Sequence, residues 1–325
     1  MNANPAWNVA VKGFPANASA RQKLGHAVKC AATAARTEEW QPWQFCLRDE
    51  HIEMSVEAGS AAVSDDSQER EVMLRCGEAL FHLKLVLKYF GCLGRVEMFP
   101  NLAQTELVAK IHHGFGRTRD AQESALFGAM LQGDDRTAPD GGMLVDSSTL
   151  VRFRDSVVDE KAWLEFSQSE LSRNQLVTLA ESGEETQTNM YRYLPQPDNS
   201  RFAQWARPLL TFMVRVGSGG NITVKTSSGQ ANEMAALAVI KTKTDDKHGW
   251  LAAGQALARI RLLTRASKIS SQVFDRIFRN RRTRTELRTS IGHKGFVQAI
   301  VGFGSSQASR IWNLPAQRQA AATFR

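Results

Sequence analysis

Cysteine and histidine are the residue types in this chain with the widest choice of chemistry, and their spacing limits that choice. The cysteines lie far apart, and no pair has the C-x-x-C spacing of a zinc site or a thioredoxin-type redox pair. Cys76 and Cys92 fall in or beside an apolar helical pattern and read as buried structural residues. His112 and His113 are adjacent, which on a helix would turn their rings about 100° apart. The sequence therefore predicts no metal site and marks no catalytic side chain.

Arginine is concentrated in one segment of the chain. Residues 241–325 hold 17 basic and 4 acidic residues, whereas residues 1–240 hold 24 and 29. One interpretation is a surface that binds phosphate groups, either in nucleic acid or in a phosphorylated cofactor, and the other is a solvated helix face. Nucleic acid is the weaker of these readings, because no zinc-finger, RNA-recognition or basic-zipper pattern supports it. The density is highest at Arg279, Arg281, Arg282, Arg284 and Arg288.

Length and composition limit the class of protein. The 325 residues predict two domain-sized units, and 42% apolar with 23% charged residues is typical of a packed globular chain. No apolar run approaches the roughly 20 residues that span a bilayer. The first residues lack a basic segment followed by an apolar one, so we expect no secretory signal and a cytoplasmic location.

Apolar periodicity and turn residues predict helices alternating with short strands. Ser19 is a candidate cap of the first helix, Asp66 or Ser67 is a candidate cap of a long one, and Gly91 ends it. The predicted helices are 19–35, 66–90, 104–112 and 249–267, with several more in 149–215; the predicted strands are 43–48, 52–56, 95–99, 235–241 and 296–303; residues 133–148 form the linker.

The two long helices resemble each other at an offset of 177 residues, because Gly77 aligns with Gly254 and Leu80 with Leu257. A glycine within a helix costs about 1 kcal/mol relative to alanine, so its use in both helices indicates a close helix–helix approach. Chance similarity between two amphipathic helices is the alternative. A repeat would make the chain an internal pseudo-dimer of two similar units.

An ordered set of motifs is similar to the nitroreductase-like flavoproteins, and in particular to their duplicated, single-chain Acg subfamily. The segment AARTEEWQPWQF at 34–45 resembles A-P-S-x-x-N-x-Q-P-W-x-F in that family. Arg70-Glu71 with the CGEAL segment at 76–80 resembles its R-E … C-G-A-A-L helix. Further resemblances lie at 96–100, at 238–257 and at 297–304.

This resemblance implies an α+β fold of nitroreductase type, with two similar units forming an internal pseudo-dimer. It places an N-terminal extension at 1–18, a first unit at 19–132, the linker at 133–148 and a second unit at 149–325. The resemblance further implies FMN bound between the units, with NAD(P)H as electron donor and a nitroaromatic or a quinone as small-molecule acceptor. In such enzymes the flavin carries the chemistry, so the absence of a catalytic constellation does not argue against an enzyme.

The resemblance also implies which residues would bind the cofactor, and several depart from the family pattern. Ala35, Arg36 and Glu39 replace the family's Pro, Ser and Asn, and an ionised Glu39 can only accept hydrogen bonds. Gln132 and Asp134 stand where the family's phosphate-binding segment has Arg and Thr. The alternative for Trp43 is that it packs in the core, and the alternative for Arg136 is that it lies in a solvated loop. The candidate cofactor-binding residues are Arg36, Glu39, Gln41, Pro42, Trp43 and Arg136.

Two functions stay open from the sequence. The first is an FMN-dependent NAD(P)H oxidoreductase, or a protein that holds FMN with restricted turnover. The second is a flavin-free paralogue that acts as a binding or regulatory protein through its basic C-terminal face. The sequence implies no membrane partner and allows a monomer, since a pseudo-dimer needs no second chain. It also raises the hypothesis that residues 149–235, which show no counterpart in the first unit, form a lid.

Overall fold

The structure is a computed structural model, and it describes the chain in segments separated by gaps, of which 167–235 is the longest. We refer to the described residues up to 132 as the N-terminal half and to those from 145 onward as the C-terminal half. The described residues are 11–34, 41–57, 65–101, 103–116, 120–132, 145, 147–166, 236–274, 276–279, 281, 284–285 and 295–304.

The N-terminal half is a four-stranded antiparallel sheet packed on helices, with the strand order β1-β2-β4-β3. As predicted, Ser19 caps the first helix, because its hydroxyl accepts a hydrogen bond from the backbone of Gln22 at 3.4 Å. The predicted hairpin also forms, with Trp43 paired with Val56. The elements are α2 (Ala20–Ala34), β1 (Trp43–Leu47), β2 (His51–Val56), α4 (Asp66–Tyr89), β3 (Leu93–Met98), β4 (Leu107–His113) and α5 (Ala121–Leu131).

One predicted helix in this half is wrong. Residues 104–112 were expected to be helical, but Leu107–His113 forms β4, an inner strand between β2 and β3. Its apolar residues Val108 and Ile111 are spaced as on a helix face and are both fully buried. A short apolar run of this kind fits either structure, and pairing with strands on both sides decided for the strand. The helix α5 was not predicted, although Asp120 and Glu123 form a capping box at its start.

The C-terminal half repeats this arrangement, since its antiparallel sheet has the order β5-β6-β8-β7. Its long helix, α9, follows the second strand of the sheet, as α4 does in the N-terminal half. The elements are α6 (Ser147–Ser156), the 3-10 turn η2 (Val157–Glu160), β5 (Ala162–Phe166), β6 (Ala236–Thr242), α9 (Lys247–Ala266), β7 (Ser270–Phe274), the 3-10 turn η3 (Arg276–Arg279) and β8 (Phe296–Gly304).

The region after residue 148 was expected to hold helices and to lack a counterpart in the first unit. The helix α6 agrees with the first expectation, but α6 and the unpredicted strand β5 precede β6 in the order in which α2 and β1 precede β2. The helix α6 also begins at Ser147, inside the predicted linker. Alternation in the five residues of β5 is too short to be seen without its partner strand β6. Residues 167–235, the rest of the hypothesised lid, lie outside the described residues.

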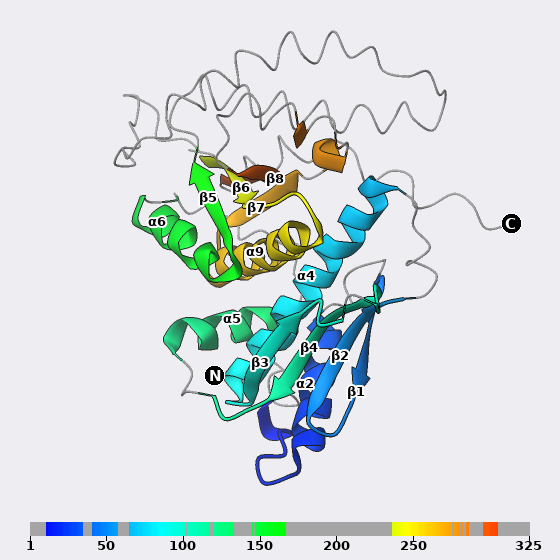
Figure 1. The fold of residues 1–325 in the computed structure, drawn as a ribbon. Coiled ribbons are helices and arrows are strands. Elements are labelled where there is room, and N and C mark those ends of the chain that lie inside the picture. The colour runs from blue at the N-terminus through cyan, green and yellow to red at the C-terminus, as the bar shows by residue number, and fades with distance from the viewer. Residues whose placement is uncertain are drawn as a thin grey trace, which may run out of the picture.

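The helices α4 and α9 cross in the middle of the molecule, between the two sheets (Figure 1). A Cβ atom placed on Gly77 would lie 2.9 Å from the Cα of Gly254 and would overlap the carbonyl oxygen of Leu251. A Cβ atom on Gly254 would in turn overlap the carbonyl oxygen of Leu74. Leu74 and Leu251 are themselves 177 residues apart. The predicted close approach of the two helices is therefore confirmed.

The ends of α4 and α9 also match at the same offset. After α4 the chain turns through Gly91 with a φ of 67°, and after α9 it turns through Lys268 with a φ of 54°. The backbone nitrogen of Cys92 donates to Leu87, and that of Ile269 donates to Thr264, both at 2.8 Å. Gly91 was predicted to end α4, whereas the lysine at the equivalent position of α9 gave no such signal.

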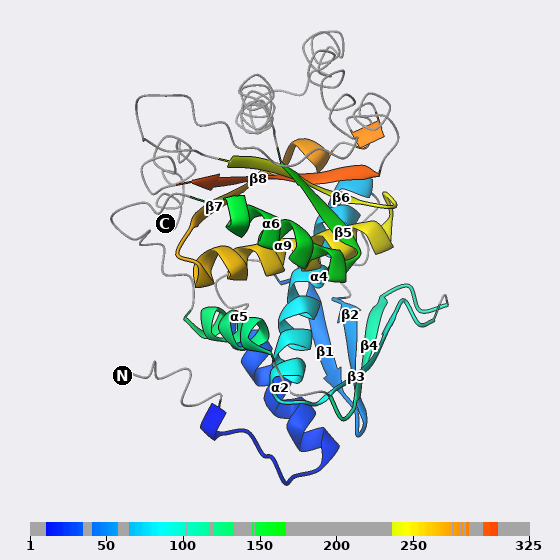
Figure 2. The same cartoon turned by 90° about the vertical axis from the view of Figure 1, so that its left-hand side faces the viewer.

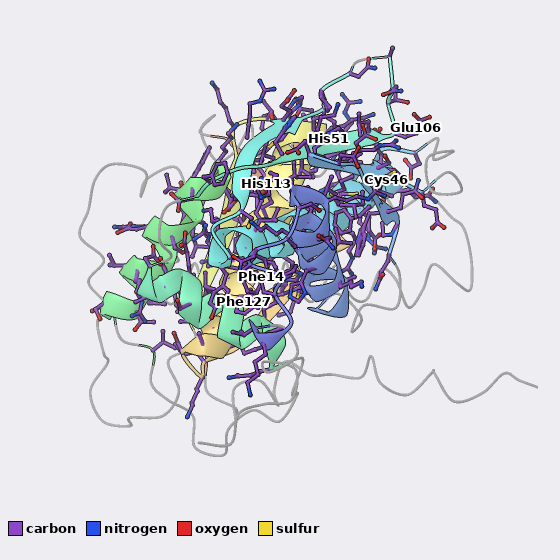
Figure 3. All side chains as sticks on the ribbon, turned by 90° about the horizontal axis from the view of Figure 1, so that it is seen from below. Phe14, Cys46, His51, Glu106, His113 and Phe127 are labelled. Carbon is purple, nitrogen blue, oxygen red and sulfur yellow. The ribbon has the colours of Figure 1, made fainter. Side chains whose placement is uncertain are left out.

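One hydrophobic core runs through both halves, because α4 and α9 bury apolar residues against each other and against the sheets. Figure 2 shows α5 and the sheet β1-β2-β4-β3 on opposite sides of α4. From below, Phe14 and Phe127 lie together on the helical side of this half, away from Cys46 at the sheet (Figure 3). Phe14 stacks on Phe90 with ring centroids 4.0 Å apart, which fixes the N-terminal segment to the end of α4.

None of the described helices is long and apolar enough to cross a membrane.

Candidate functional site

Three of the six predicted cofactor-binding residues lie in the described part of the chain. Trp43 begins β1, is half-buried and packs against the core, with its ring 4.9 Å from that of Phe45. Pro42 accepts a backbone hydrogen bond from Glu57 at 2.8 Å. These contacts agree with the core-packing interpretation of Trp43. Arg36, Glu39 and Arg136 lie outside the described residues.

The strand register shows which end of the sheet carries Trp43. Trp43 pairs with Val56, and the backbone of Val56 donates to Glu106, just before β4. The same end of the sheet includes Phe99, which follows β3 and stands 4.6 Å, ring to ring, from His248 in the first turn of α9. The Gln41-Pro42-Trp43 end of the N-terminal sheet therefore faces the seam with the C-terminal half.

The first turn of α9 is capped and tied to α4 at this seam. Asp246 accepts hydrogen bonds from the backbone nitrogens of His248 and Gly249, both at 3.0 Å. Burial raises the pKa of Asp246, but these hydrogen bonds outweigh it and hold the pKa below its usual value. Lys247 pairs with Glu69 of α4 at 2.9 Å. The seam thus combines aromatic side chains with a fixed helix N-terminus.

A second seam, between the start of α4 and the C-terminal sheet, is filled by a buried arginine. The Arg284 side chain is fully buried, and its guanidinium contacts Asp245 at 2.8 Å and Asp66 at 2.6 Å. It also donates to two backbone carbonyls and lies over the ring of Trp250 at 5.6 Å. Trp250 in turn donates to Asp245 at 2.8 Å. This network, the Arg284 cluster, holds the two halves together.

Arg70 of α4 extends the second seam into the C-terminal sheet. It is 1% exposed and donates to the backbone oxygen and to the side-chain oxygen of Gln298 in β8. Gln298 donates to the hydroxyl of Thr242 at 3.0 Å. Arg70 and Gln298 belong to motifs of the sequence resemblance, and here they serve the contact between the halves.

A charged cluster, the Glu160 cluster, crosses the interface nearer the ends of α4 and α9. Glu160 accepts hydrogen bonds from Lys84 and from Arg259, both at 2.7 Å, and Lys84 also donates to Gln255 at 2.7 Å. The guanidinium of Arg259 lies over Phe81 at 5.2 Å, and its enclosed Nε has no hydrogen-bond partner among the described residues. Sequence reasoning missed this cluster. Its only sign in the sequence was Lys84, a charged residue between apolar positions of the predicted helix 66–90.

Burial and charge oppose each other within the Glu160 cluster. Burial lowers the pKa of Lys84, and Glu160 only partly reverses this effect. Burial likewise raises the pKa of Glu160, but Lys84 and Arg259 together outweigh it and hold the pKa below its usual value. Glu160 is therefore ionised near neutral pH.

His82 of α4 lies near the same interface and has no such compensation. The residue is half-buried, and its Nδ1 is enclosed without a hydrogen-bond partner among the described residues. Burial, together with the positive charges of Arg261 and Arg265, lowers the pKa of His82 to about 4. The imidazole is therefore neutral at physiological pH. The sequence singled out His112 and His113 rather than this residue.

The basic last quarter of the sequence contacts the acidic start of α4. Arg279 pairs with Glu71 at 2.7 Å, in addition to the pairs that Lys247 and Arg284 make with the same helix. Of the five arginines at the density peak, Arg281 is exposed, while Arg282 and Arg288 lie outside the described residues. Part of the charge asymmetry in the sequence thus serves to join the two halves.

The cysteines differ in burial, and burial sets the pKa of their thiols. Cys76 is fully buried, and burial raises its pKa to about 12; burial also raises the pKa of Cys30 to about 11. Cys46 is exposed. Among the described residues, no group of three or more His, Cys, Asp or Glu side chains could hold a metal ion.

Comparison with known proteins gives a weak and partial similarity. No family profile matches the chain. Two Mycobacterium tuberculosis sequences, from strains CDC 1551 / Oshkosh and ATCC 25618 / H37Rv, are described as "Putative NAD(P)H nitroreductase acg". Each is 29% identical to this chain over 75 residues, which is 23% of this chain and 23% of the relative. Because the match spans less than a quarter of either chain, it indicates a distant nitroreductase-like relationship and no more.

Proposed function

We propose that the protein is a nitroreductase-like flavoprotein whose two halves form an internal pseudo-dimer and hold one FMN between them. The observation that carries this proposal is the repeated topology: two sheets of the same strand order, joined by α4 and α9 at a glycine-to-glycine crossing. The partial similarity to a protein described as an NAD(P)H nitroreductase agrees with it.

The seam at the Trp43 end of the first sheet suits a flavin better than the seam filled by the Arg284 cluster. Phe99 and His248 bring aromatic rings to this seam, which an isoalloxazine could pack against, and Trp43 begins β1 at the same end of the sheet. The second seam is closed by a buried arginine whose donors bond to aspartates and backbone carbonyls. We therefore assign a single flavin to the first seam, with Gln41 offering amide hydrogen bonds to the ring edge.

When bound, FMN would accept a hydride from NAD(P)H and pass electrons to a small acceptor such as a nitroaromatic or a quinone. The chain's own contribution is to orient the ring and to keep it between two rigid halves. The Glu160 and Arg284 clusters serve this purpose, because they connect α4 with the C-terminal half on both sides of the glycine crossing.

The visible spectrum of the purified full-length chain tests the proposal, together with quenching of FMN fluorescence on titration. A flavin absorption band, or saturable quenching, would support it. Gln41→Ala should weaken FMN binding about tenfold, the effect of about 1.4 kcal/mol. Gln44→Ala is the matched control, because Gln44 is exposed on the same strand and should not change binding. A colourless protein that quenches no FMN fluorescence would contradict the proposal and favour the flavin-free alternative.

A further inference from the structure

The outer face of the N-terminal sheet brings two histidines together across neighbouring strands. His51 of β2 pairs with His112 of β4. The backbone nitrogen of His113 donates to the carbonyl oxygen of Glu50 at 2.9 Å, which makes His51 and His112 a non-hydrogen-bonded pair. Opposite side chains approach most closely in such pairs, and here the two ring centroids are 5.5 Å apart. Residues 104–112 were expected to be helical, and only the strand places these two rings side by side.

Each of these rings is held by a carboxylate through its Nε2 atom. His51 Nε2 lies 3.3 Å from an oxygen of Glu53, and His112 Nε2 lies 2.8 Å from an oxygen of Glu97. An ionised carboxylate only accepts hydrogen bonds, so each Nε2 carries a proton, and in the neutral ring Nδ1 then keeps its lone pair. Among the described residues, no hydrogen bond reaches the Nδ1 atom of either ring. The pair thus offers two imidazole lone pairs at one place on the sheet.

The two carboxylates are themselves fixed by cations on the same face. Glu53 contacts Arg48 at 2.8 Å and Lys110 at 3.7 Å. Glu97 contacts Arg95 at 2.6 Å. Because the carboxylate oxygens are engaged in this way, the face offers little to a hard cation such as Mg²⁺, which takes oxygen ligands. The free donor atoms are imidazole nitrogens, which suit late first-row metals such as zinc, nickel and copper.

We propose that His51 and His112 form a binding site for a late first-row divalent metal ion, with Zn²⁺ as the representative ion and water completing its coordination. Zinc binds histidine nitrogen at about 2.0–2.1 Å, so two imidazoles on one tetrahedral zinc have ring centroids about 5 Å apart. The observed separation of 5.5 Å is close to this value. A histidine that binds a metal commonly donates its other N–H to a carboxylate, as both rings do here. Two side chains suffice for such a site, which needs no group of three or more among the described residues.

The histidine pair lies at the opposite end of the sheet from Trp43. Trp43 begins β1 and pairs with Val56 at the end of β2, whereas His51 stands at the start of β2. Figure 3 shows His51 on the sheet side of this half, away from Phe14 on the helical side. The proposed metal site is therefore separate from the seam that we assign to the flavin, and each can be tested without the other.

Calorimetric titration of Zn²⁺ into the full-length chain at pH 7.5 provides the test. Loss of the carboxylate behind a ligating histidine weakens metal binding about 10–100-fold, so loss of either ligand in His51→Gln or His112→Gln should weaken zinc binding at least about tenfold. Cys46→Ser is the matched control, because Cys46 is exposed on the neighbouring strand and its thiol is not part of the site. This variant should bind zinc as the unaltered chain does, and excess Mg²⁺ should not compete.

Labelling of the histidines with 15N identifies the nitrogen that binds the metal. Without metal, both rings should show the tautomer with the proton on Nε2, and zinc should shift the Nδ1 signals of both. Glu97→Gln should weaken zinc binding about tenfold and mix the tautomers of His112, because an amide can donate as well as accept. Glu106→Gln is its control, since Glu106 is exposed before β4 and should change neither the zinc affinity nor the tautomers.

The inference would be overturned by unchanged zinc affinity in His112→Gln, by loss of zinc binding in Cys46→Ser, or by a zinc-induced shift at Nε2 rather than at Nδ1. If His112→Gln does not fold, His51→Gln decides the first of these outcomes. None of the measurements requires a flavin. A chain that binds zinc at the histidine pair and no FMN would therefore support the metal site and contradict the flavin function alone.

Discussion

The N-terminal and C-terminal halves share a topology but differ in the side chains that surround it. Gly77 and Gly254 occupy equivalent positions, because at this crossing any Cβ would overlap the backbone of the other helix. The side chains nearby have diverged: Glu160 contacts Lys84 and Arg259, whereas His82 stands at the position that corresponds to Arg259 in the other half. Backbone sterics leave the crossing no alternative, whereas an interface charge can be moved to a neighbouring residue or supplied by a ligand.

The two sheets also share a strand order but differ in how far their outer faces are buried. In β2 the polar residues His51 and Glu53 alternate with the fully buried Ile52 and Met54. In β6 both sets of alternating residues are buried, and even Lys241 is 2% exposed and paired with Glu165 at 2.5 Å. The same strand order thus supports one sheet with a polar outer face and one that is buried on both faces.

The largest effect should come from Glu160→Gln, which leaves Lys84 and Arg259 buried without their carboxylate. Removing one partner of a buried pair costs about 3–5 kcal/mol, so the free energy of unfolding in urea should fall by this amount. Glu78→Gln is the matched control, because its partners Arg75 and Arg261 are 28% and 37% exposed. It should cost about 1 kcal/mol or less. Equal losses of unfolding free energy in the two variants would contradict the expectation that the buried Glu160 cluster depends more on its carboxylate than the more exposed Glu78 pairs do.

Alanine at the helix crossing should have the next largest effect, and it should be similar in both halves. Gly77→Ala and Gly254→Ala each force a methyl group against a backbone carbonyl, which costs about 2–3 kcal/mol of unfolding free energy. Gly25→Ala is the control, since its Cβ would meet only the end of the Leu47 side chain at 3.2 Å. It should be neutral, or stabilise α2 by up to about 1 kcal/mol. Tolerance of either crossing variant would contradict the close approach.

The free energy of unfolding should depend on pH through His82, which stands on one side of the interface. Its pKa of about 4 in the folded chain is below the value of about 6.5 expected when unfolded, so the unfolded chain binds more protons between these values. Stability should therefore rise with pH across this window, by about 2 kcal/mol after allowance for partial exposure.

Urea unfolding at pH 5 and pH 7, in a buffer free of phosphate, measures this slope. His82→Gln should flatten it, and His248→Gln should leave it intact. A slope that survives in His82→Gln would assign the pH dependence to another group.

The smallest effect concerns the turns that end α4 and α9. Lys268 has a left-handed backbone at a place where α4 uses Gly91, so Lys268→Gly should stabilise the chain by about 0.5–1 kcal/mol. Gly91→Lys should destabilise it by about 1 kcal/mol. Thermal unfolding of both variants measures the difference. Destabilisation by Lys268→Gly would mean that contacts of the lysine outweigh its backbone strain.

Most helices and strands could be predicted from local signals, and the failures have a common cause. The predictions for α2, α4 and the hairpin rest on capping residues, turn residues and apolar spacing, and the structure confirms these elements, although the N-cap of α4 is Asp65 rather than the predicted Asp66 or Ser67. The sequence misassigned β4 and missed β5 and β7 because five to seven residues hold too little periodicity to show a strand without its partners. Trp43 packs against the core at the start of β1, and its predicted role in cofactor binding stays a prediction, since local sequence does not show what a side chain packs against.

By itself, the sequence determined most of the longer helices, the first hairpin, the pair of similar helices and the close approach of their glycines, because each depends on spacing within a short segment. Only the tertiary structure decided the partners of the charged residues. Arg284 meets Asp66 across 218 positions, and Glu160 meets Lys84 across 76. Coulomb energy depends on distance in space and on burial, neither of which follows from separation along the chain. For the same reason, the unpartnered nitrogen of His82 became visible only once the two halves were in place.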